Sequence, residues 1–192
     1  MLEINFLPFP ILKTKRLILK QVDAKDADTI LSLRSNDEVM KYIPRPYLKT
    51  KDDALALIAM FDDKIENGIG INWGIYFVDE PEKLLGIIGH YRIKPEHHRA
   101  EVGYMIFPEH NGKGIITEAL QKVVEYGFKE MKLHSMEAIL DPENKGSEKV
   151  LQKNGFTKEG HFIENIFFKG KWGSEFQFAL LKKEWDNNLL PL

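Results

Sequence analysis

The chain alternates between two patterns of apolar residues, one typical of strands and one typical of helices. Short segments rich in β-branched and aromatic residues, bounded by prolines, glycines and charged turns, predict seven strands. These strands span residues 16–22, 71–78, 84–93, 101–107, 135–140, 156–168 and 174–181. Apolar residues at three- and four-residue spacing predict helices within residues 23–33, 37–43, 51–66, 108–132 and 141–154. Residues 1–15 are expected to form a loose arm that leads into the first strand.

Residues 108–132 join a glycine-bearing turn to a strongly amphipathic helix, and the other elements can be arranged around them. The apolar side of this helix carries Ile116, Ala119, Leu120, Val123, Val124, Phe128 and Met131. The opposite side carries Glu118, Gln121, Lys122, Glu125 and Lys129. Before the turn, Val102, Tyr104 and Ile106 alternate as in a half-buried strand. The sequence therefore predicts the order strand, glycine turn, helix.

The glycine turn has the composition of an anion-binding site. The first N–H groups of a helix lack internal partners, and the helix dipole adds partial positive charge there. Gly112 and Gly114 have no side chains to keep a phosphate away from these donors, and Lys113 adds a cation. The same residues would also suit a plain strand-to-helix turn. A Rossmann fingerprint is excluded because Thr117 replaces its third glycine, and the chain contains no P-loop motif.

Composition narrows the class of protein further. No linker-like or low-complexity segment interrupts the 192 residues, so residues 1–192 are expected to form a single domain. The formal net charge of -2, with lysines interspersed among acidic residues, argues against direct nucleic-acid or membrane-surface binding. The absence of cysteine excludes disulfides and thiolate metal sites, and His97 and His98 lack a third ligand, so no metal site is predicted. Without an apolar segment long enough to span a bilayer, a cytoplasmic location is expected.

The order of the elements predicts how the strands pair. Short links favour antiparallel pairing up to residue 107, whereas the crossover helix sets the 135–140 strand parallel to the 101–107 strand. Asp141, Pro142 and Glu143 have the composition of a helix start, with an N-cap residue, a proline at the first helical position and an acid in the first turn. Gly155 is expected to cap the end of that helix.

Two motifs now point to a known family. Residues 108–120, PEHNGKGIITEAL, are similar to an acetyl-CoA loop that usually reads Gln/Arg-Gly-x-Gly-x-Ala/Gly. Residues 141–160 are similar to an Asn-x-x-Ser and Leu-x-x-x-Gly-Phe pattern. The chain thus resembles the GNAT-fold N-acetyltransferases, specifically the branch that contains the ribosomal-protein N-terminal (alanine) acetyltransferases. Residues 16–19, 101–104 and 179–185 match in the same order, so the resemblance covers nearly the whole chain.

This resemblance implies a fold and a cofactor. The fold is an α/β (α+β) GNAT fold, with a mixed, mostly antiparallel sheet of about seven strands flanked by helices, in which parallel strands 4 and 5 splay apart. Acetyl-CoA, or its product coenzyme A, would lay its pantetheine arm in that opening and its pyrophosphate on the glycine turn. The cofactor-binding residues so implied are Met105, Ile106, Phe107, Asn111, Gly112, Lys113, Gly114, Ile115, Ile116, Thr117 and Asn144. Asn111 is shorter and Ile116 bulkier than the family pattern, so weakened but retained binding is expected.

The resemblance also implies direct attack of a primary amine on acetyl-CoA in a ternary complex. Ser147, the serine of Asn-x-x-Ser, is the predicted donor to the departing sulfur, although a helical serine can instead bond a nearby carbonyl. Glu101 is the predicted general base; the alternative is an acid on a wet strand face. Tyr104 is expected to face the other way, into the core. Packing roles are expected for Trp73, Tyr91, Trp172 and Trp185, of which Trp73 and Tyr91 are candidates to border the acceptor pocket.

The acceptor stays open at this stage. A protein N-terminus, a polyamine, an aminoglycoside or another small amine would suit the fold. An alternative hypothesis is a non-catalytic, acyl-CoA-binding regulatory domain, indicated by Asn111 and Ile116 and opposed by the presence of both Ser147 and Glu101. A domain without cofactor is disfavoured by the intact glycine turn. The final hairpin would allow a homodimer.

Overall fold

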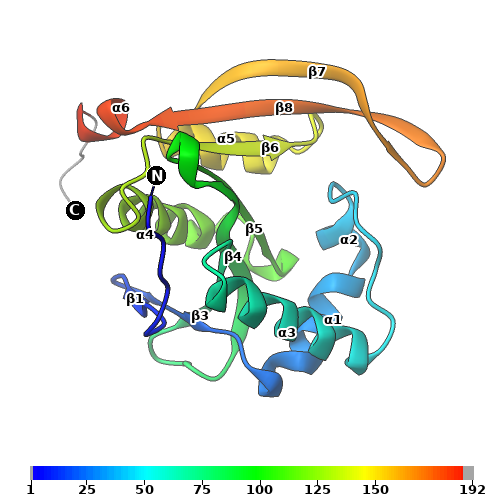
Figure 1. Ribbon diagram of the computed structural model, residues 1–192. Coiled ribbons are helices and arrows are strands. Elements are labelled where there is room, and N and C mark those ends of the chain that lie inside the picture. Colours follow the sequence, from blue (N-terminus) through cyan, green and yellow to red (C-terminus); the bar gives the residue numbers. More distant parts are fainter. Residues whose placement is uncertain (1, 188–192) are drawn as a thin grey trace.

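The computed structural model describes residues 2–187, in which eight strands form one sheet in the order β1-β2-β3-β4-β5-β6-β8-β7 (Figure 1). The strands are β1 Leu12–Lys13, β2 Leu17–Gln21, β3 Ile71–Phe77, β4 Leu84–Lys94, β5 Arg99–Ile106, β6 Ser135–Leu140, β7 Thr157–Phe168 and β8 Lys171–Leu181. β5 and β6 are parallel, and the other neighbours are antiparallel. The predicted mixed sheet is confirmed. The ends of the predicted single domain, Met1 and residues 188–192, lie outside the described residues.

The sheet has one strand more than the sequence predicts, because β1 forms inside the segment expected to be a loose arm. Leu12 pairs with Leu19, and its side chain is buried in the core. The indole N–H of Trp73 donates to the carbonyl of Pro10 over 2.7 Å. Tertiary contacts with distant strands therefore order a segment that has little strand signal of its own.

Helices cover both faces of the sheet. They are η1 Ala24–Asp26, α1 Ala27–Ser35, α2 Asp37–Met40, α3 Lys51–Glu66, η2 Pro95–His97, η3 Pro108–His110, α4 Ile115–Lys129, α5 Lys145–Lys153 and α6 Lys182–Asn187. Figure 1 shows α4 on one side of the central strands and α1 and α3 on the other. The start of α3 was predicted correctly because it is encoded locally: Thr50 and Asp53 exchange side-chain to backbone hydrogen bonds in a capping box.

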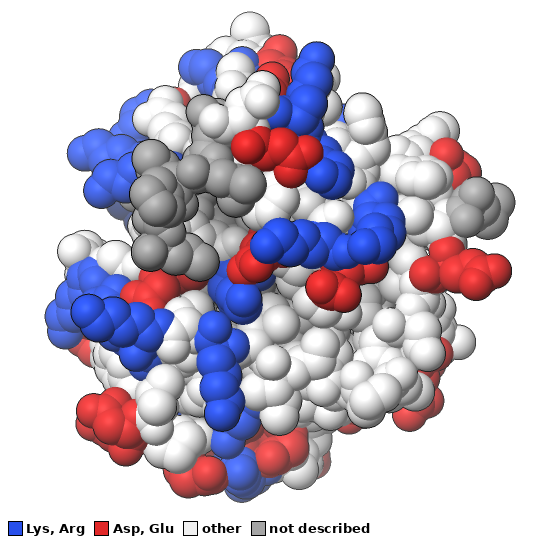
Figure 2. All heavy atoms as spheres, turned by 90° about the vertical axis from the view of Figure 1, so that its left-hand side faces the viewer, with Lys and Arg blue, Asp and Glu red and all other residues white. Residues whose placement is uncertain are grey.

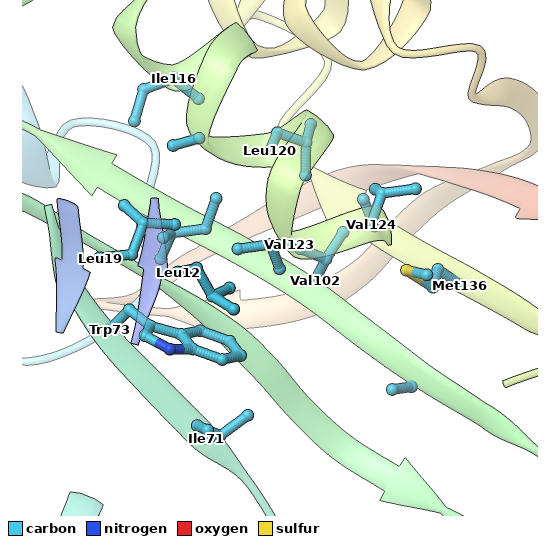
Figure 3. Packing of buried hydrophobic residues seen from close by; sticks show 14 of the residues in the cluster. Leu12, Leu19, Ile71, Trp73, Val102, Ile116, Leu120, Val123, Val124 and Met136 are labelled. Atoms are coloured by element: carbon cyan, nitrogen blue, oxygen red, sulfur yellow. The ribbon is translucent and has the colours of Figure 1, made fainter. Parts of the chain in front are cut away.

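The largest apolar cluster lies between α4 and the sheet. In Figure 3, Leu120, Val123 and Val124 project from α4 toward strands that carry Leu19 and Trp73. All five side chains are at most 2% exposed, which confirms Trp73 as a packing residue. A second cluster on the opposite face joins α1 and α3 to β3 and β4 through Ala27, Ile30, Leu33, Ile58, Phe61, Tyr76 and Ile87. Burial on both faces makes the middle of the sheet a fixed platform for the elements at its edge.

β5 and β6 separate along their length. Cα pairing between them covers only Arg99 to Glu101 with Ser135 to Glu137. Beyond this point β5 still pairs with β4 as far as Ile106, while β6 pairs with β8 as far as Leu140. Each strand follows its outer neighbour, and a wedge opens between them. The predicted parallel, splayed pair is confirmed.

The predicted start of α5 is wrong by about one turn. The side chain of Asp141 accepts from the N–H of Glu143 over 2.8 Å, and the segment forms a turn. The helix begins after Asn144, whose Oδ1 accepts from the N–H of Ser147 over 3.0 Å. Asp141 and Asn144 both have N-cap chemistry, and the sequence alone favoured the one followed by proline.

The end of α5 is as predicted. Gly155 adopts a left-handed φ of +83°, and its N–H donates to the carbonyl of Gln152. The N–H of Phe156 reaches the carbonyl of Leu151 over 3.0 Å. These two bonds make a Schellman motif, which turns the chain out of the helix and into β7.

The β7–β8 hairpin extends beyond the body of the molecule in Figure 1. Trp172 near its tip is 63% exposed and packs on Phe167, with ring centroids 5.0 Å apart, so its packing lies within the hairpin and not in the core. The ammonium of Lys169 lies 4.4 Å from the ring centroid of Tyr47, in the segment after α2. The hairpin tip thus leans on the loop between α2 and α3.

The surface charge follows the composition. On the face shown in Figure 2, basic and acidic side chains lie next to one another. Within residues 2–187, none of the helices combines the length and hydropathy needed to cross a membrane.

Candidate active site

A cavity of about 660 Å³ lies where the end of β5, the start of α4, the start of α5 and the α2 region meet. Its lining includes most of the residues that the sequence predicts for the site: Met105, Ile106, Asn111, Gly112, Gly114, Ile115, Ile116, Thr117, Asn144 and Ser147. Glu101, Phe107 and Lys113 are not part of this lining. The fold therefore brings the glycine turn and the Asn-x-x-Ser segment to one place.

The glycine turn has the backbone of an anion-binding site. Gly112 and Gly114 have left-handed φ values of +72° and +73°, which explains why both positions are glycine. Gly114 is the N-cap of α4 and provides no side-chain cap. Glu118 makes the first bond of the helix, from its N–H to the carbonyl of Gly114. The three preceding N–H groups, from Ile115 to Thr117, have no protein acceptor within residues 2–187 and lie at the cavity, where they suit a phosphate.

Arg16 braces this turn, a role that the sequence does not reveal. Its Nε donates to Glu118 over 2.6 Å, and its Nη1 donates to the carbonyl of Lys113 over 3.1 Å. Thr14 also donates to Glu118. Glu118 was expected on the wet face of α4, but its side chain is only 19% exposed. Burial would raise the pKa of Glu118, yet the bonds from Thr14 and Arg16 hold it below its ordinary value.

The two departures from the family pattern have different consequences. Ile116 is 8% exposed and packs in the main core cluster, so most of its bulk lies away from the turn. Asn111 is exposed at the cavity, and its N–H donates to the carbonyl of Pro108. Its shorter side chain remains available to a ligand.

Ser147 lies in the first turn of α5 and contacts Tyr104. The two hydroxyl oxygens are 2.7 Å apart, and both residues line the cavity. The prediction that Tyr104 is a core residue holds for its ring, which packs on the main cluster, but misses its hydroxyl. Burial raises the pKa of Tyr104 to about 12, against the opposing effect of the hydrogen bond to Ser147. Tyr104 is therefore a neutral phenol at physiological pH.

Glu101 lies on the opposite face of the sheet from Tyr104, because their positions differ by an odd number of residues. Its carboxylate accepts from Arg92 over 2.8 Å, and its side chain is 17% exposed. Burial raises the pKa of Glu101; Arg92 opposes the rise, and Glu137 adds to it. Glu101 pairs with Glu137 in the last β5–β6 pair before the strands separate. Glu101 and Ser147 thus flank the opening from different sides.

Of the three residues of the Met105–Phe107 segment, only one has backbone groups free to bond the pantetheine arm. The N–H of Phe107 donates to Leu85 over 3.1 Å, and its carbonyl accepts from His110, so both groups are engaged. Successive residues of a strand direct their N–H and C=O groups to opposite sides. The backbone groups of Ile106 consequently face the opening, whereas those of Met105 face β4.

Several charged residues at the cavity were missed from the sequence. Lys41, Lys145, Lys149 and Lys153 line it, together with Glu38 and Glu143. The four-residue spacing of Lys149 and Lys153 on α5 was the available signal. Within residues 2–187, no three His, Cys, Asp or Glu side chains are grouped so that they could hold a metal ion.

The acetyltransferase (GNAT) domain family matches residues 16–157. The chain belongs to this family. An uncharacterized N-acetyltransferase of Bacillus subtilis, YoaA, is 39% identical over 162 residues, which cover 84% of this chain and 91% of that protein. A GNAT-family acetyltransferase structure from Bacillus anthracis is 31% identical, with a TM-score of 0.79 over 91% of this chain and all of that one.

Two Escherichia coli relatives have the same lower identity and different acceptors in their names. One is a [ribosomal protein uS5]-alanine N-acetyltransferase, 25% identical over 91% of this chain and 92% of that protein. The other is a spermidine N(1)-acetyltransferase, 25% identical over 87% of each chain. The predicted GNAT membership, fold and enzyme class, N-acetyltransferase, are confirmed, whereas the acceptor is not decided by likeness.

Proposed function

We propose that this N-acetyltransferase transfers the acetyl group of acetyl-CoA to the α-amine of a polypeptide, by direct attack in a ternary complex. The observation that carries the proposal is the cavity in which the glycine turn and Ser147 meet at the opening between β5 and β6. The unpartnered N–H groups at the start of α4 fit the pyrophosphate of acetyl-CoA, and the wedge fits its extended arm. When bound, acetyl-CoA supplies an acetyl group activated as a thioester.

The residues of the chain divide the remaining tasks. The N–H of Ile106 is placed to bond a carbonyl lying in the opening, and Arg16 keeps the glycine turn in position. Ser147 donates a hydrogen bond to the departing sulfur. Glu101, from the other face, takes the proton of the incoming ammonium. Burial raises the pKa of Glu101, which makes it a stronger base than an ordinary glutamate.

Direct attack is supported by the composition. The chain contains no cysteine that could carry the acetyl group as a thioester. Ser147 is engaged with Tyr104, and among residues 2–187 the cavity lining holds one histidine, His110, whose pKa is lowered mainly by burial. Amine attack on the bound donor therefore needs no acetylated enzyme.

Charge on the strands beside the opening supports an acceptor with a single amine. Strands β5, β6 and β8 carry three carboxylates on the Glu101 face of the sheet, and each already has a hydrogen-bond donor. Glu101 contacts Arg92, Glu137 contacts Lys94, Arg99 and Gln177, and Glu175 contacts Asn165. A polyamine needs several free carboxylates for its additional cations. A polypeptide N-terminus places one amine ahead of a chain that need not be charged.

The test follows thiol release from acetyl-CoA with peptides that carry ribosomal-protein N-termini, and with spermidine, aminoglycosides and free amino acids. We expect turnover with peptides and little with spermidine. Preferred turnover of spermidine would overturn the acceptor class but keep the transferase. Binding of acetyl-CoA without turnover of any acceptor would instead support the non-catalytic regulator.

A further inference from the structure

We infer that Tyr104 is a positioning residue for the leaving group: its phenol donates to Ser147 Oγ, so that the Ser147 O–H is directed at the departing sulfur. The inference rests on the proposed acetyl transfer and adds to it a residue to which the sequence motifs assign no catalytic role. Tyr104 and Ser147 would act as a chain of two hydroxyls ending at the sulfur.

The position of Tyr104 in the fold places it at the opening. It follows Glu101, the last residue of β5 that pairs with β6, by three positions. Its side chain is on the α4 and α5 side of the sheet, between Val102 and Ile106 of the same face. No residue of β6 pairs with Tyr104, so its hydroxyl reaches across the wedge to the first turn of α5.

The contacts of the two hydroxyl groups allow Tyr104 to be the donor of the pair. The backbone N–H of Ser147 is held by Asn144 Oδ1 at 3.0 Å, which fixes the start of α5. The Tyr104 oxygen is 2.7 Å from Ser147 Oγ and 3.4 Å from the Ser147 carbonyl. One hydrogen lies between the two hydroxyl oxygens. When Tyr104 provides it, the hydrogen of Ser147 is free for a group in the cavity.

The chemistry requires a hydrogen-bond donor and no full proton transfer. When the carbon–sulfur bond breaks, sulfur keeps the electron pair, and the acetyl carbon bonds to the amine nitrogen, whose second proton passes to water because Glu101 has already taken the proton of the ammonium. A thiol has an ordinary pKa of about 8.5, so the thiolate leaves readily and gains from a donated hydrogen bond. Burial raises the pKa of Tyr104 to about 12, so this phenol keeps its hydrogen and remains a donor across the working pH range.

The test compares Tyr104→Phe with Tyr126→Phe as a matched control. Tyr126 is on α4, packs edge-on against Trp73 and does not line the cavity, and burial raises its pKa to about 12 as well. The first readout is the pKa of the coenzyme A thiol when bound to the protein. It is followed by thiolate absorbance, with desulfo-coenzyme A as the blank. The second is kcat and KM for acetyl-CoA with the preferred acceptor.

We expect Tyr104→Phe to raise the pKa of the bound thiol by about 1 and to lower kcat about tenfold, with KM for acetyl-CoA changed less than about twofold. Ser147→Ala should raise the thiol pKa similarly, and the double variant should add little to either. Tyr126→Phe should change neither quantity. An unchanged thiol pKa in Tyr104→Phe would overturn the inference. If the wild type acetylates no amine but its bound thiol has a lower pKa than the thiol bound to Tyr104→Phe, the proposed function fails and the hydroxyl chain stands.

Discussion

Arg16, immediately before β2, contacts Glu118 in the first turn of α4 through two bonds. Its Nε lies 2.6 Å from Oε2, and its backbone N–H lies 3.0 Å from Oε1. The same guanidinium donates to the carbonyl of Lys113. Arg16 thus joins the start of β2, the glycine turn and the helix that follows. The turn is held in its anion-binding shape before any ligand arrives, which reduces the ordering that binding requires.

Glu118→Gln should weaken acetyl-CoA binding, because a neutral amide holds Arg16 and Thr14 less firmly than a carboxylate does. Loss of charge-assisted bonds on a partly exposed pair corresponds to about 1 kcal/mol, or roughly a fivefold rise in Kd. Calorimetric titration with acetyl-CoA measures the change in Kd. Glu125→Gln is the control, since Glu125 is on the same helix and pairs with Lys122 and Lys129 far from the turn. Equal Kd values for wild type and Glu118→Gln would show that the Arg16–Glu118 contact does not hold the glycine turn in its binding conformation.

Glu101 should set the acid limb of the pH–rate profile. A protonated carboxyl cannot accept the ammonium proton, so kcat/KM should fall as pH drops through the pKa of Glu101, which burial raises above its ordinary value. Glu101→Gln should remove this limb and lower kcat/KM about 100-fold or more. Glu175→Gln should move the limb to lower pH, because Glu175 also raises the pKa of Glu101.

The loss in Glu101→Gln should not reflect unfolding. A carboxyl whose pKa is higher in the folded state than in the unfolded chain favours folding at low pH, and that contribution is lost as pH rises through the folded pKa. Above that pKa the charge on Glu101 therefore disfavours folding. The free energy of unfolding of Glu101→Gln, measured in urea, should be no lower than that of the wild type. An acid limb unchanged in Glu101→Gln would show that solvent, and not this carboxylate, takes the proton.

His90 should make the protein sensitive to mild acid. It is fully buried, its Nε2 lies 3.1 Å from the carbonyl of Val123, and burial lowers its pKa to about 4. In the unfolded chain its pKa is about 6.5, so only the unfolded state binds a proton between pH 6.5 and 4. As pH drops through this range, protonation of His90 in the unfolded chain should lower the free energy of unfolding by about 1.4 kcal/mol per pH unit.

Urea titrations at several pH values test this dependence in the wild type and in His90→Gln. The glutamine keeps a donor but cannot titrate, so the variant should lack this part of the slope whatever its stability at pH 7. A slope equal to that of the wild type would assign the acid sensitivity to other groups.

Gly127→Ala should destabilise the protein although alanine is the better helix former. A Cβ at position 127 would lie 2.6 Å from Met136 Cε and 3.1 Å from His90 Cε1. The end of Met136 can move, but the His90 ring is confined. Overpacking of about 1–3 kcal/mol should exceed the gain of about 1 kcal/mol in helix propensity.

Thermal or urea unfolding measures the net effect of Gly127→Ala. Gly146→Ala is the control: position 146 is exposed in the first turn of α5, and its nearest contact would be Asn144 Oδ1 at 3.7 Å. It should be neutral or slightly stabilising. A Gly127→Ala protein more stable than the wild type would show that the core accommodates the methyl group.

The sequence by itself determined the elements whose signals are local. The bounds of α3 were predicted correctly because Thr50 and Asp53 cap a helix with a clear apolar stripe. Gly112 and Gly114 were assigned to a turn between a strand and a helix, and their left-handed φ values of +72° and +73° agree with that assignment, while anion binding there stays a prediction. Local dihedral preferences and apolar spacing are properties of short segments, so they can be read without knowing the fold.

Only the tertiary structure decided which distant residues meet. Arg16 and Glu118 are 102 positions apart, and Tyr104 and Ser147 are 43 apart. No periodicity reports such contacts, and alternation placed Tyr104 on the correct face without showing that its hydroxyl reaches α5. The choice between Asp141 and Asn144 as N-cap was likewise not local, because both have suitable side chains. The helix that packs against α4 and β6 starts after Asn144, and packing free energy exceeds the small difference between two caps.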